Sequence, residues 1–287
     1  MTQYAAYPVH PALQRYIKMY FIVRINEIEP TNILFSANPY AVLLFNFGGN
    51  EVPITSDFNF NNKLNKNKKF TFYNHQSWFG GMHDGTVAAQ FAPNVNILFA
   101  FFTPIGVHHL LRDNAGNAFN QGFSFDEMGL DKKFDGLTDK LQTVKGNDEA
   151  QKLLETYFLR YFCAIDIQFS LKDMSPVADY IERQNGVVKI KQLEDKFHIS
   201  RRWLEKQFVA QIGMPPKDFA RITRFNALLG QVTTTPSVSW SEMIDDYGYY
   251  DHSHLIRDFH DFTGQSPTQY FKDTPDVMNS FFYSSLE

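Results

Sequence analysis

The sequence predicts an α+β protein of two domains, in which a β-rich N-terminal domain precedes an all-α C-terminal domain. Three observations predict this architecture. The chain has 287 residues, enough for two domains of ordinary size. Short apolar runs separated by turn residues occupy its first part, and helical patterns joined by short turns follow after about residue 171. With 44 % apolar residues, 29 of the 287 being Phe, the chain is not a disordered one.

The N-terminal part reads as a β-sandwich or a small barrel. Turn signals such as Asn-Pro at 38–39, Gly-Gly at 80–81 and Asp-Gly at 84–85 separate its apolar runs. The predicted strands cover residues 33–35, 40–47, 70–73, 87–91 and 97–102. A short helix over 104–112 and a longer one over 147–162 follow. Asn147 or Asp148 is the expected N-cap of the longer helix.

Helix 147–162 carries a wide aromatic stripe on one face. The stripe consists of Leu153, Leu154, Tyr157, Phe158, Tyr161 and Phe162. It can pack on the β-domain of its own chain, or it can form the interface of a homodimer. The sequence leaves both interpretations open.

The C-terminal part contains an internal repeat. Residues 200–219 align with residues 251–270 at an offset of 51, and the segment before each turn aligns at an offset of 50, so the second turn has one extra residue. The matched pairs are Leu204 with Leu255, Phe208 with Phe259, Gly213 with Gly264, and Pro216 with Pro267. Each copy reads as helix, tight turn, helix and Gly stop. This is a helix-turn-helix motif, expected at about 190–211 and 240–262.

Local signals support the helix ends in both copies. Ser200 is the expected N-cap of the second helix of the first copy, which Gly213 ends. A connecting helix is expected from about 216 to 231. The second helix of the second copy covers about 251–262 and ends at Gly264. In a helix-turn-helix motif this second helix enters the major groove of double-stranded DNA.

The motifs of this region resemble the AraC/XylS family of bacterial transcription regulators. The resemblance covers about residues 171–273 and rests on Ile-Ser-Arg-Arg-Trp-Leu-Glu-Lys-Gln-Phe at 199–208, Gly-Met-Pro-Pro-Lys-Asp-Phe at 213–219, Tyr-Gly-Tyr-Tyr-Asp-His-Ser-His-Leu-Ile-Arg-Asp-Phe at 247–259, and Thr-Gly-Gln-Ser-Pro-Thr-Gln-Tyr at 263–270. The segment Phe-Ala-Pro-Asn-Val-Asn-Ile-Leu-Phe at 91–99 is similar to part of the sensor domain of some members. The resemblance implies a cupin-like sensor domain, a DNA-binding domain and a dimer.

Three segments are therefore expected. Residues 1–165 form the β-rich sensor domain with its terminal helix, and residues 171–273 form the DNA-binding domain. The tail, 274–287, contains Phe281, Phe282 and Tyr283, so we expect it to pack on one of the two domains.

The resemblance and the helical period together select the candidate DNA contacts. In the first copy, Leu204 and Phe208 face the core, and the outward or leading positions are Ser200, Arg201, Arg202, Glu205 and Lys206. In the second copy the corresponding residues are His252, Ser253, Ile256 and Arg257. Arg can pair with guanine and Glu can accept a hydrogen bond from cytosine. The alternative is that these side chains only form a solvated helix face.

The distribution of charge favours the first copy. The whole chain has a formal charge of −4, and residues 171–287 contain 13 Lys and Arg against 16 Asp and Glu. The cations gather in the first copy and the connecting helix, at Arg201, Arg202, Lys206, Lys217, Arg221 and Arg224. In the second copy, Arg257 is flanked by Asp251, Asp258 and Asp261 and we expect these to offset its charge. We therefore predict that the first copy dominates DNA affinity.

The sequence indicates neither an enzyme nor a metal or cofactor site. Among the mid-region histidines, His75, His83, His108 and His109, no His-x-His pair occurs. The single cysteine, Cys163, excludes a four-cysteine zinc site and a disulfide framework within the chain. Phosphate-loop, dinucleotide and Ser-His-Asp signatures are not found. Apolar runs fall far short of the ~20 residues of a membrane helix, and the N-terminus lacks a signal-peptide pattern, so a cytoplasmic protein is expected.

The expected function is a sequence-specific transcription regulator controlled by a ligand or partner of the N-terminal domain. The Phe-rich N-terminal half can line a pocket for an apolar small-molecule effector, although the sequence does not assign the pocket residues. RNA polymerase is a further expected partner. In the alternative function, the helix-turn-helix pair is only the scaffold of a protein-interaction module.

Overall fold

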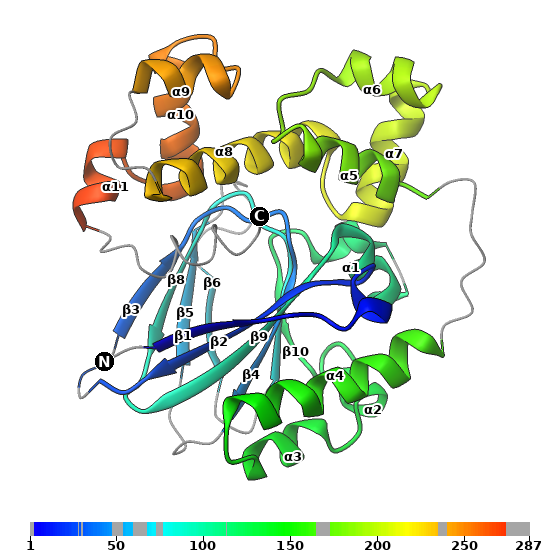
Figure 1. Cartoon of the computed structure of the whole chain (residues 1–287), viewed down its shortest axis with the longest axis vertical. Coiled ribbons are helices and arrows are strands. Elements are labelled where there is room, and N and C mark those ends of the chain that lie inside the picture. Colours follow the sequence, from blue (N-terminus) through cyan, green and yellow to red (C-terminus); the bar gives the residue numbers. More distant parts are fainter. Residues whose placement is uncertain are drawn as a thin grey trace.

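The computed structural model describes residues 3–27, 29, 31–47, 54–59, 68–72, 77–112, 114–164, 173–234 and 240–273. Within these ranges, strands occupy the N-terminal region and helices the C-terminal region (Figure 1). The tail 274–287, His75 and the segment between the two regions lie outside the described residues. No helix in the described ranges is long and apolar enough to cross a membrane.

The N-terminal region contains two antiparallel sheets. One has the strand order β1-β2-β9-β4-β7-β10 and the other β3-β8-β5-β6. The first sheet comprises β1 (Gln3–Tyr7), β2 (Ile17–Ile25), β9 (Val95–Phe102), β4 (Val42–Phe47), β7 (Ser77–Gly80) and β10 (Gly122–Ser124). The second comprises β3 (Thr31–Phe35), β8 (Thr86–Phe91), β5 (Ile54–Asn59) and β6 (Lys68–Phe72). The prediction of a β-rich N-terminal fold is therefore confirmed.

The central strand β9 is buried on both of its faces. Phe99 and Phe101 point into the space between the sheets, and Phe102 packs on helix α4 (Asn147–Cys163), with its ring 5.8 Å from that of Phe158. Strand β2 is paired to β9 along nearly its whole length and is likewise buried. Strands buried on both faces lose the alternation of apolar and polar residues.

Helix α4 buries its aromatic stripe inside its own domain. Phe162 stacks on Tyr16 with the ring centroids 4.5 Å apart, and Leu154 and Phe158 are completely buried. The Tyr157 hydroxyl donates to the Asp135 carbonyl at 3.0 Å, and that of Tyr161 donates to the Leu110 carbonyl at 3.0 Å. The stripe thus packs mainly inside its own domain, as the internal-core interpretation predicts.

Smaller elements complete the N-terminal region. They are helices α1 (Pro104–Leu111), α2 (Leu130–Lys133) and α3 (Leu137–Thr143), and 3₁₀ turns at Pro11–Leu13 and Ala115–Ala118. The predicted cap of α4 at Asn147 or Asp148 is wrong, because Gly146 is the N-cap and offers no side chain. The Glu149 carboxylate instead accepts a hydrogen bond from the Lys145 backbone amide.

The C-terminal region consists of helices joined by short turns, as predicted. They are α5 (Ser175–Arg183), α6 (Ile190–Phe197), α7 (Arg201–Ile212), α8 (Pro216–Thr234), α9 (Trp240–Asp246), α10 (His252–Thr263) and α11 (Pro267–Asp273). Figure 1 shows α8 running across one end of the sheets, between α5–α7 on one side and α9–α11 on the other.

The predicted N-cap at Ser200 is confirmed, and Asp251 caps the corresponding helix of the second copy. The Ser200 hydroxyl accepts from the Trp203 amide, and the Asp251 carboxylate accepts from the His254 amide at 2.7 Å. Gly213 and Gly264 end the helices with φ of 100° and 71°. This left-handed conformation favours glycine.

Candidate nucleic-acid interface and sensor cavity

The outward face of α7 presents the candidate contacts of the first copy. Leu204 and Phe208 are completely buried, which turns the opposite side of the helix to solvent. The exposed residues of this side are Ser200, Arg201, Arg202, Glu205 and Lys206. The structure therefore brings all five predicted residues together on one accessible surface.

Two of these five residues form an ion pair with each other. Nε of Arg201 lies 2.9 Å from a carboxylate oxygen of Glu205, and the Arg201 backbone amide donates to Glu194. Exposed pairs of this kind contribute little free energy and rearrange at low cost. Within the described residues, Arg202 and Lys206 form no ion pair, so they are the cations that α7 offers to an anionic partner.

The outward face of α10 presents the candidate contacts of the second copy. His252, Ser253, Ile256 and Arg257 are exposed, and Leu255 and Phe259 are buried. Tyr250, which precedes α10, is 91 % exposed. It is the extra residue in the turn of the second copy, and the alignment of the two copies could have marked it as a candidate contact.

The expected charge balance of the second copy is wrong. Asp258 is completely buried and binds cations from α8, with Nη2 of Arg221 at 2.6 Å and Nη2 of Arg224 at 2.9 Å. Asp261 also binds Arg221, at 2.8 Å, and Asp251 caps α10. These aspartates therefore do not serve to neutralise Arg257. Nor do Arg221 and Arg224 extend the basic surface of the first copy, because their charges are directed at α10.

Among the described histidines of the mid-region, the rings of His108 and His109 pack edge-on with their centroids 5.6 Å apart. The His83 ring packs beside the Gly85 carbonyl, 2.9 Å from its Nδ1, and loss of solvent around the ring lowers the pKa of His83 to about 4. His109 packs edge-on against Tyr16, and burial is the main cause that lowers its pKa. No group of three or more potential metal ligands occurs in the part of the chain that the structure describes.

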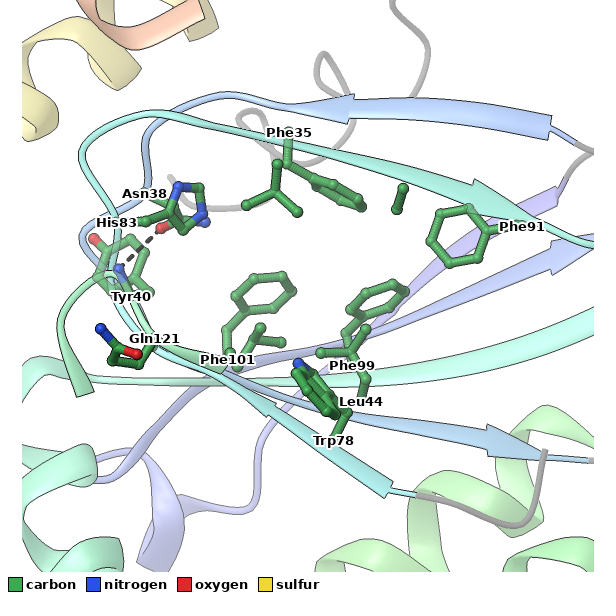
Figure 2. Close-up of a pocket in the computed structure, with 15 residues that line it drawn as sticks. Phe35, Asn38, Tyr40, Leu44, Trp78, His83, Phe91, Phe99, Phe101 and Gln121 are labelled. Carbon is green, nitrogen blue, oxygen red and sulfur yellow. Dashed lines mark hydrogen bonds between the residues drawn. The ribbon is translucent and has the colours of Figure 1, made fainter. Parts of the chain in front are cut away.

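A narrow apolar cavity lies between the two sheets (Figure 2). Its volume is about 80 Å³, and Figure 2 shows side chains of both sheets pointing toward one another across it. The apolar wall includes Phe35, Val87 and Phe91 from one sheet and Val42, Leu44, Trp78, Phe99 and Phe101 from the other. The sequence indicated an apolar pocket in this domain but could not select its residues, because they come from several strands that meet only in the folded sheets.

The polar end of this cavity is built from loops. Asn38, Tyr40, His83 and Gln121 lie there, and the Asn38 side chain accepts a hydrogen bond from the Tyr40 amide at 2.9 Å (Figure 2). The backbones of Asn38 and His83 exchange two hydrogen bonds of 2.9 Å, which join the two loops.

The same loops contact both helix-turn-helix units. The Ala37 amide donates to the carbonyl of Phe262, near the end of α10, at 3.0 Å. Gly213 at the end of α7 lies so close to Met82 that a Cβ there would collide with the methionine. The loops around the cavity are therefore in contact with the ends of both α7 and α10.

Charged pairs add further contacts between the two regions. Arg15 binds Asp173 at 2.9 Å, and Lys18 binds Glu182 at 3.2 Å. Burial, and then the neighbouring Glu182 carboxylate, raise the pKa of Tyr40 well above its usual value.

A comparison with protein families identifies the C-terminal region. Residues 193–273 match the family model described as a helix-turn-helix domain. The C-terminal domain is an AraC-type helix-turn-helix domain. Domains of this type are DNA-binding modules of transcription regulators. The matched range begins in α6 and ends with α11, so it includes both recognition helices.

Several solved structures of transcription regulators resemble the chain at low sequence identity. ToxT from Vibrio cholerae O395 is 11 % identical with a TM-score of 0.49, over 96 % of this chain and 99 % of that chain. An apo point variant of ToxT from Vibrio cholerae strain SCE256 is 9 % identical with a TM-score of 0.47, over 88 % and 97 %. The AraC-like transcriptional activator CuxR is 12 % identical with a TM-score of 0.26, over 78 % and 85 %. No curated protein matches the sequence significantly.

Proposed function

We propose that the protein is a sequence-specific transcription regulator that binds double-stranded DNA through α7 and α10. The proposed contacts of α7 are Ser200, Arg201, Arg202, Glu205 and Lys206, and those of α10 are His252, Ser253, Ile256 and Arg257. We propose residues 1–165 as the sensor domain and 171–273 as the DNA-binding domain.

The observation that carries this proposal is the matched exposure of the two recognition helices. Each helix buries its Leu and Phe and leaves the opposite face accessible. The connecting helix α8 has 19 residues, which corresponds to about 28 Å at ~1.5 Å per residue. This length is close to the ~34 Å turn of B-DNA, so the two helices can address successive major grooves on one side of the duplex.

The apolar cavity supports control by a small apolar effector. Aromatic and aliphatic side chains form most of its wall, which suits an apolar molecule. Its present 80 Å³ is below the roughly 300 Å³ of a typical small-molecule site, so Phe side chains must change rotamer to admit a ligand. Such a change would act on the loops at Asn38 and His83 and, through Ala37 and Met82, on both recognition helices.

Selection from genomic DNA tests the function. The intact protein is incubated with genomic fragments, the bound DNA is sequenced, and the enriched site is examined by gel shift. We expect one enriched motif whose binding weakens steeply as salt is raised. If the folded protein retains no fragment at low salt, the result contradicts the proposal and favours the alternative function, a protein-interaction module.

A further inference from the structure

A second cavity lies between the sheet domain and the helical domain. Its volume is about 470 Å³, within the ~300–1,000 Å³ range of small-molecule sites. The sheet domain contributes Lys18, Pro39 and Tyr40, and the other lining residues come from α5, α8 and their neighbours. Tyr40 also lines the apolar sensor cavity, so its side chain stands between the two.

One face of α8 forms the inner wall of this interdomain cavity. Thr223, Asn226, Ala227 and Gly230 recur at the spacing of a single helix face. A polar face of this kind is unusual where two domains pack together, because apolar side chains would bury it at a lower cost in free energy.

Asn226, on this wall of the cavity, is a buried polar side chain without a hydrogen-bond partner in the described part of the chain. Its side chain is 7 % exposed, and neither Oδ1 nor Nδ2 has a hydrogen-bond partner within the described part of the chain. The Oγ1 of Thr223, one turn away, is buried and equally without a partner there. Buried polar groups in proteins are almost always hydrogen-bonded, so these two side chains call for a partner that enters the cavity.

The remaining lining residues select the chemistry of that partner. An Asn side chain pairs at two points with a planar group that offers an adjacent donor and acceptor, as the edge of adenine does. Tyr40 and Tyr247 provide aromatic surface in the same cavity, and Arg183 is exposed. The neighbouring Glu182 carboxylate also lines the cavity and is bound by Lys18 at 3.2 Å. Aromatic rings suit a nucleobase, and Arg suits a phosphate.

We propose that the interdomain cavity binds a small anionic nucleotide of the adenosine monophosphate class. Its base edge pairs with Asn226 and Thr223, and its phosphate lies near Arg183. The site is distinct from the apolar sensor cavity, with which it shares Tyr40. A bound nucleotide touches both domains and therefore favours the arrangement in which they are packed together.

Calorimetric titration of the full chain without DNA tests this site with three probes. AMP carries both recognition elements, adenosine only the base and sugar, and ribose 5-phosphate only the sugar and anion. We expect AMP to bind most tightly, adenosine more weakly and ribose 5-phosphate not measurably up to about 1 mM. No binding of AMP at that concentration overturns the proposal, and equal binding of AMP and ribose 5-phosphate overturns the base contact.

Two substitutions locate the binding. Asn226→Leu keeps the branched shape of the side chain and removes the unpartnered amide, so we expect an unchanged or raised melting temperature and AMP affinity weakened at least about tenfold. Arg183→Ala should weaken AMP binding and leave adenosine binding unchanged. Asn117→Leu makes the same chemical change at an exposed position outside the cavity and should alter neither ligand.

Each alternative outcome is decisive. AMP affinity that survives Asn226→Leu places the nucleotide elsewhere and overturns the proposal. If Asn226→Leu does not fold, Thr223→Val removes a single hydroxyl from the same wall and should weaken AMP binding several-fold. Unaltered AMP affinity in a folded Thr223→Val variant contradicts the site as well.

Discussion

Arg221 of α8 binds the completely buried carboxylate of Asp258 on α10, with 2.6 Å between Nη2 and Oδ1. Arg224 binds the other oxygen of the same carboxylate at 2.9 Å, and its guanidinium lies 4.1 Å from the centre of the Tyr249 ring. One acidic side chain thus joins the second recognition helix to the connecting helix. This arrangement fixes the orientation of α10 relative to α8.

Removing the charge of Asp258 is therefore expected to destabilise the helical domain. Breaking a buried ion pair on one side costs about 3–5 kcal/mol in other proteins. We expect Asp258→Asn to lower the free energy of unfolding by about 3 kcal/mol in urea denaturation, because two arginines lose their common partner. Asp245→Asn, at an exposed position of α9, is the matched control and should change it by less than about 0.5 kcal/mol. Equal stability of the two variants would show that the buried pair is dispensable.

The two recognition helices should differ in their dependence on salt. The α7 face offers Arg202 and Lys206, whereas α10 offers Arg257, and each phosphate contact contributes about 0.9 to the slope of log affinity against log salt. We expect the slope to fall by about two in Arg202→Ala/Lys206→Ala and by about one in Arg257→Ala. Gel shifts of a selected site between low and moderate salt give these slopes. A larger fall for Arg257→Ala would identify α10 as the electrostatic anchor and refute the predicted dominance of the first copy.

Ile256 predicts a different mode of recognition by α10. This side chain is 40 % exposed on the outward face, and an apolar group in the major groove contacts the methyl group of thymine. Replacing the contacted thymine by uracil removes that methyl alone and should weaken binding by about 1 kcal/mol. In the Ile256→Ala variant, the same replacement of thymine by uracil should leave the DNA affinity unchanged. The account of α10 is wrong if no thymine in the second half of the site is sensitive to uracil.

His83 should make the stability of the N-terminal domain depend on pH. Its pKa is about 4 in the folded protein, compared with about 6.5 for an unperturbed histidine, so the unfolded chain binds the extra proton first. This contribution to stability is complete above about pH 6.5 and is lost as the pH falls toward 4. We expect His83 to account for a loss of about 2 kcal/mol between pH 7 and pH 5. In urea denaturation at pH 7 and pH 5, His83→Gln should lose about 2 kcal/mol less of its free energy of unfolding than the unsubstituted protein. The same pH dependence in both proteins would contradict the role of His83.

The helix-turn-helix units were predictable because their signals are local. Ser200, Gly213 and Gly264 define helix ends through their own caps and backbone angles, and the repeat places them in register. The strands were less predictable from the sequence. Strand β2 was not predicted, because its continuous apolar run has no alternation and its burial depends on β9, far along the chain.

In the candidate sites, too, only the features set by local sequence could be predicted. The exposed faces of α7 and α10 follow from helical period alone, and the structure places those residues as expected. The partners of Asp258 could not be foreseen, because Arg221 and Arg224 precede it by more than thirty residues and reach it only once α8 and α10 pack. The two cavities likewise depend on tertiary structure. Asn226 and Tyr40 have no sequence relationship that would bring them to one cavity.

Hydroxyl-radical footprinting of the intact protein on its selected genomic site tests the central claim most directly, that both recognition helices act on one duplex. We predict two protected segments on the same face of the DNA, about 10 base pairs apart, with the second lost in a variant that removes the outward side chains of α10. A single protected segment that is unaffected by substitutions in α10, or no protection at all by the folded protein, would contradict the account.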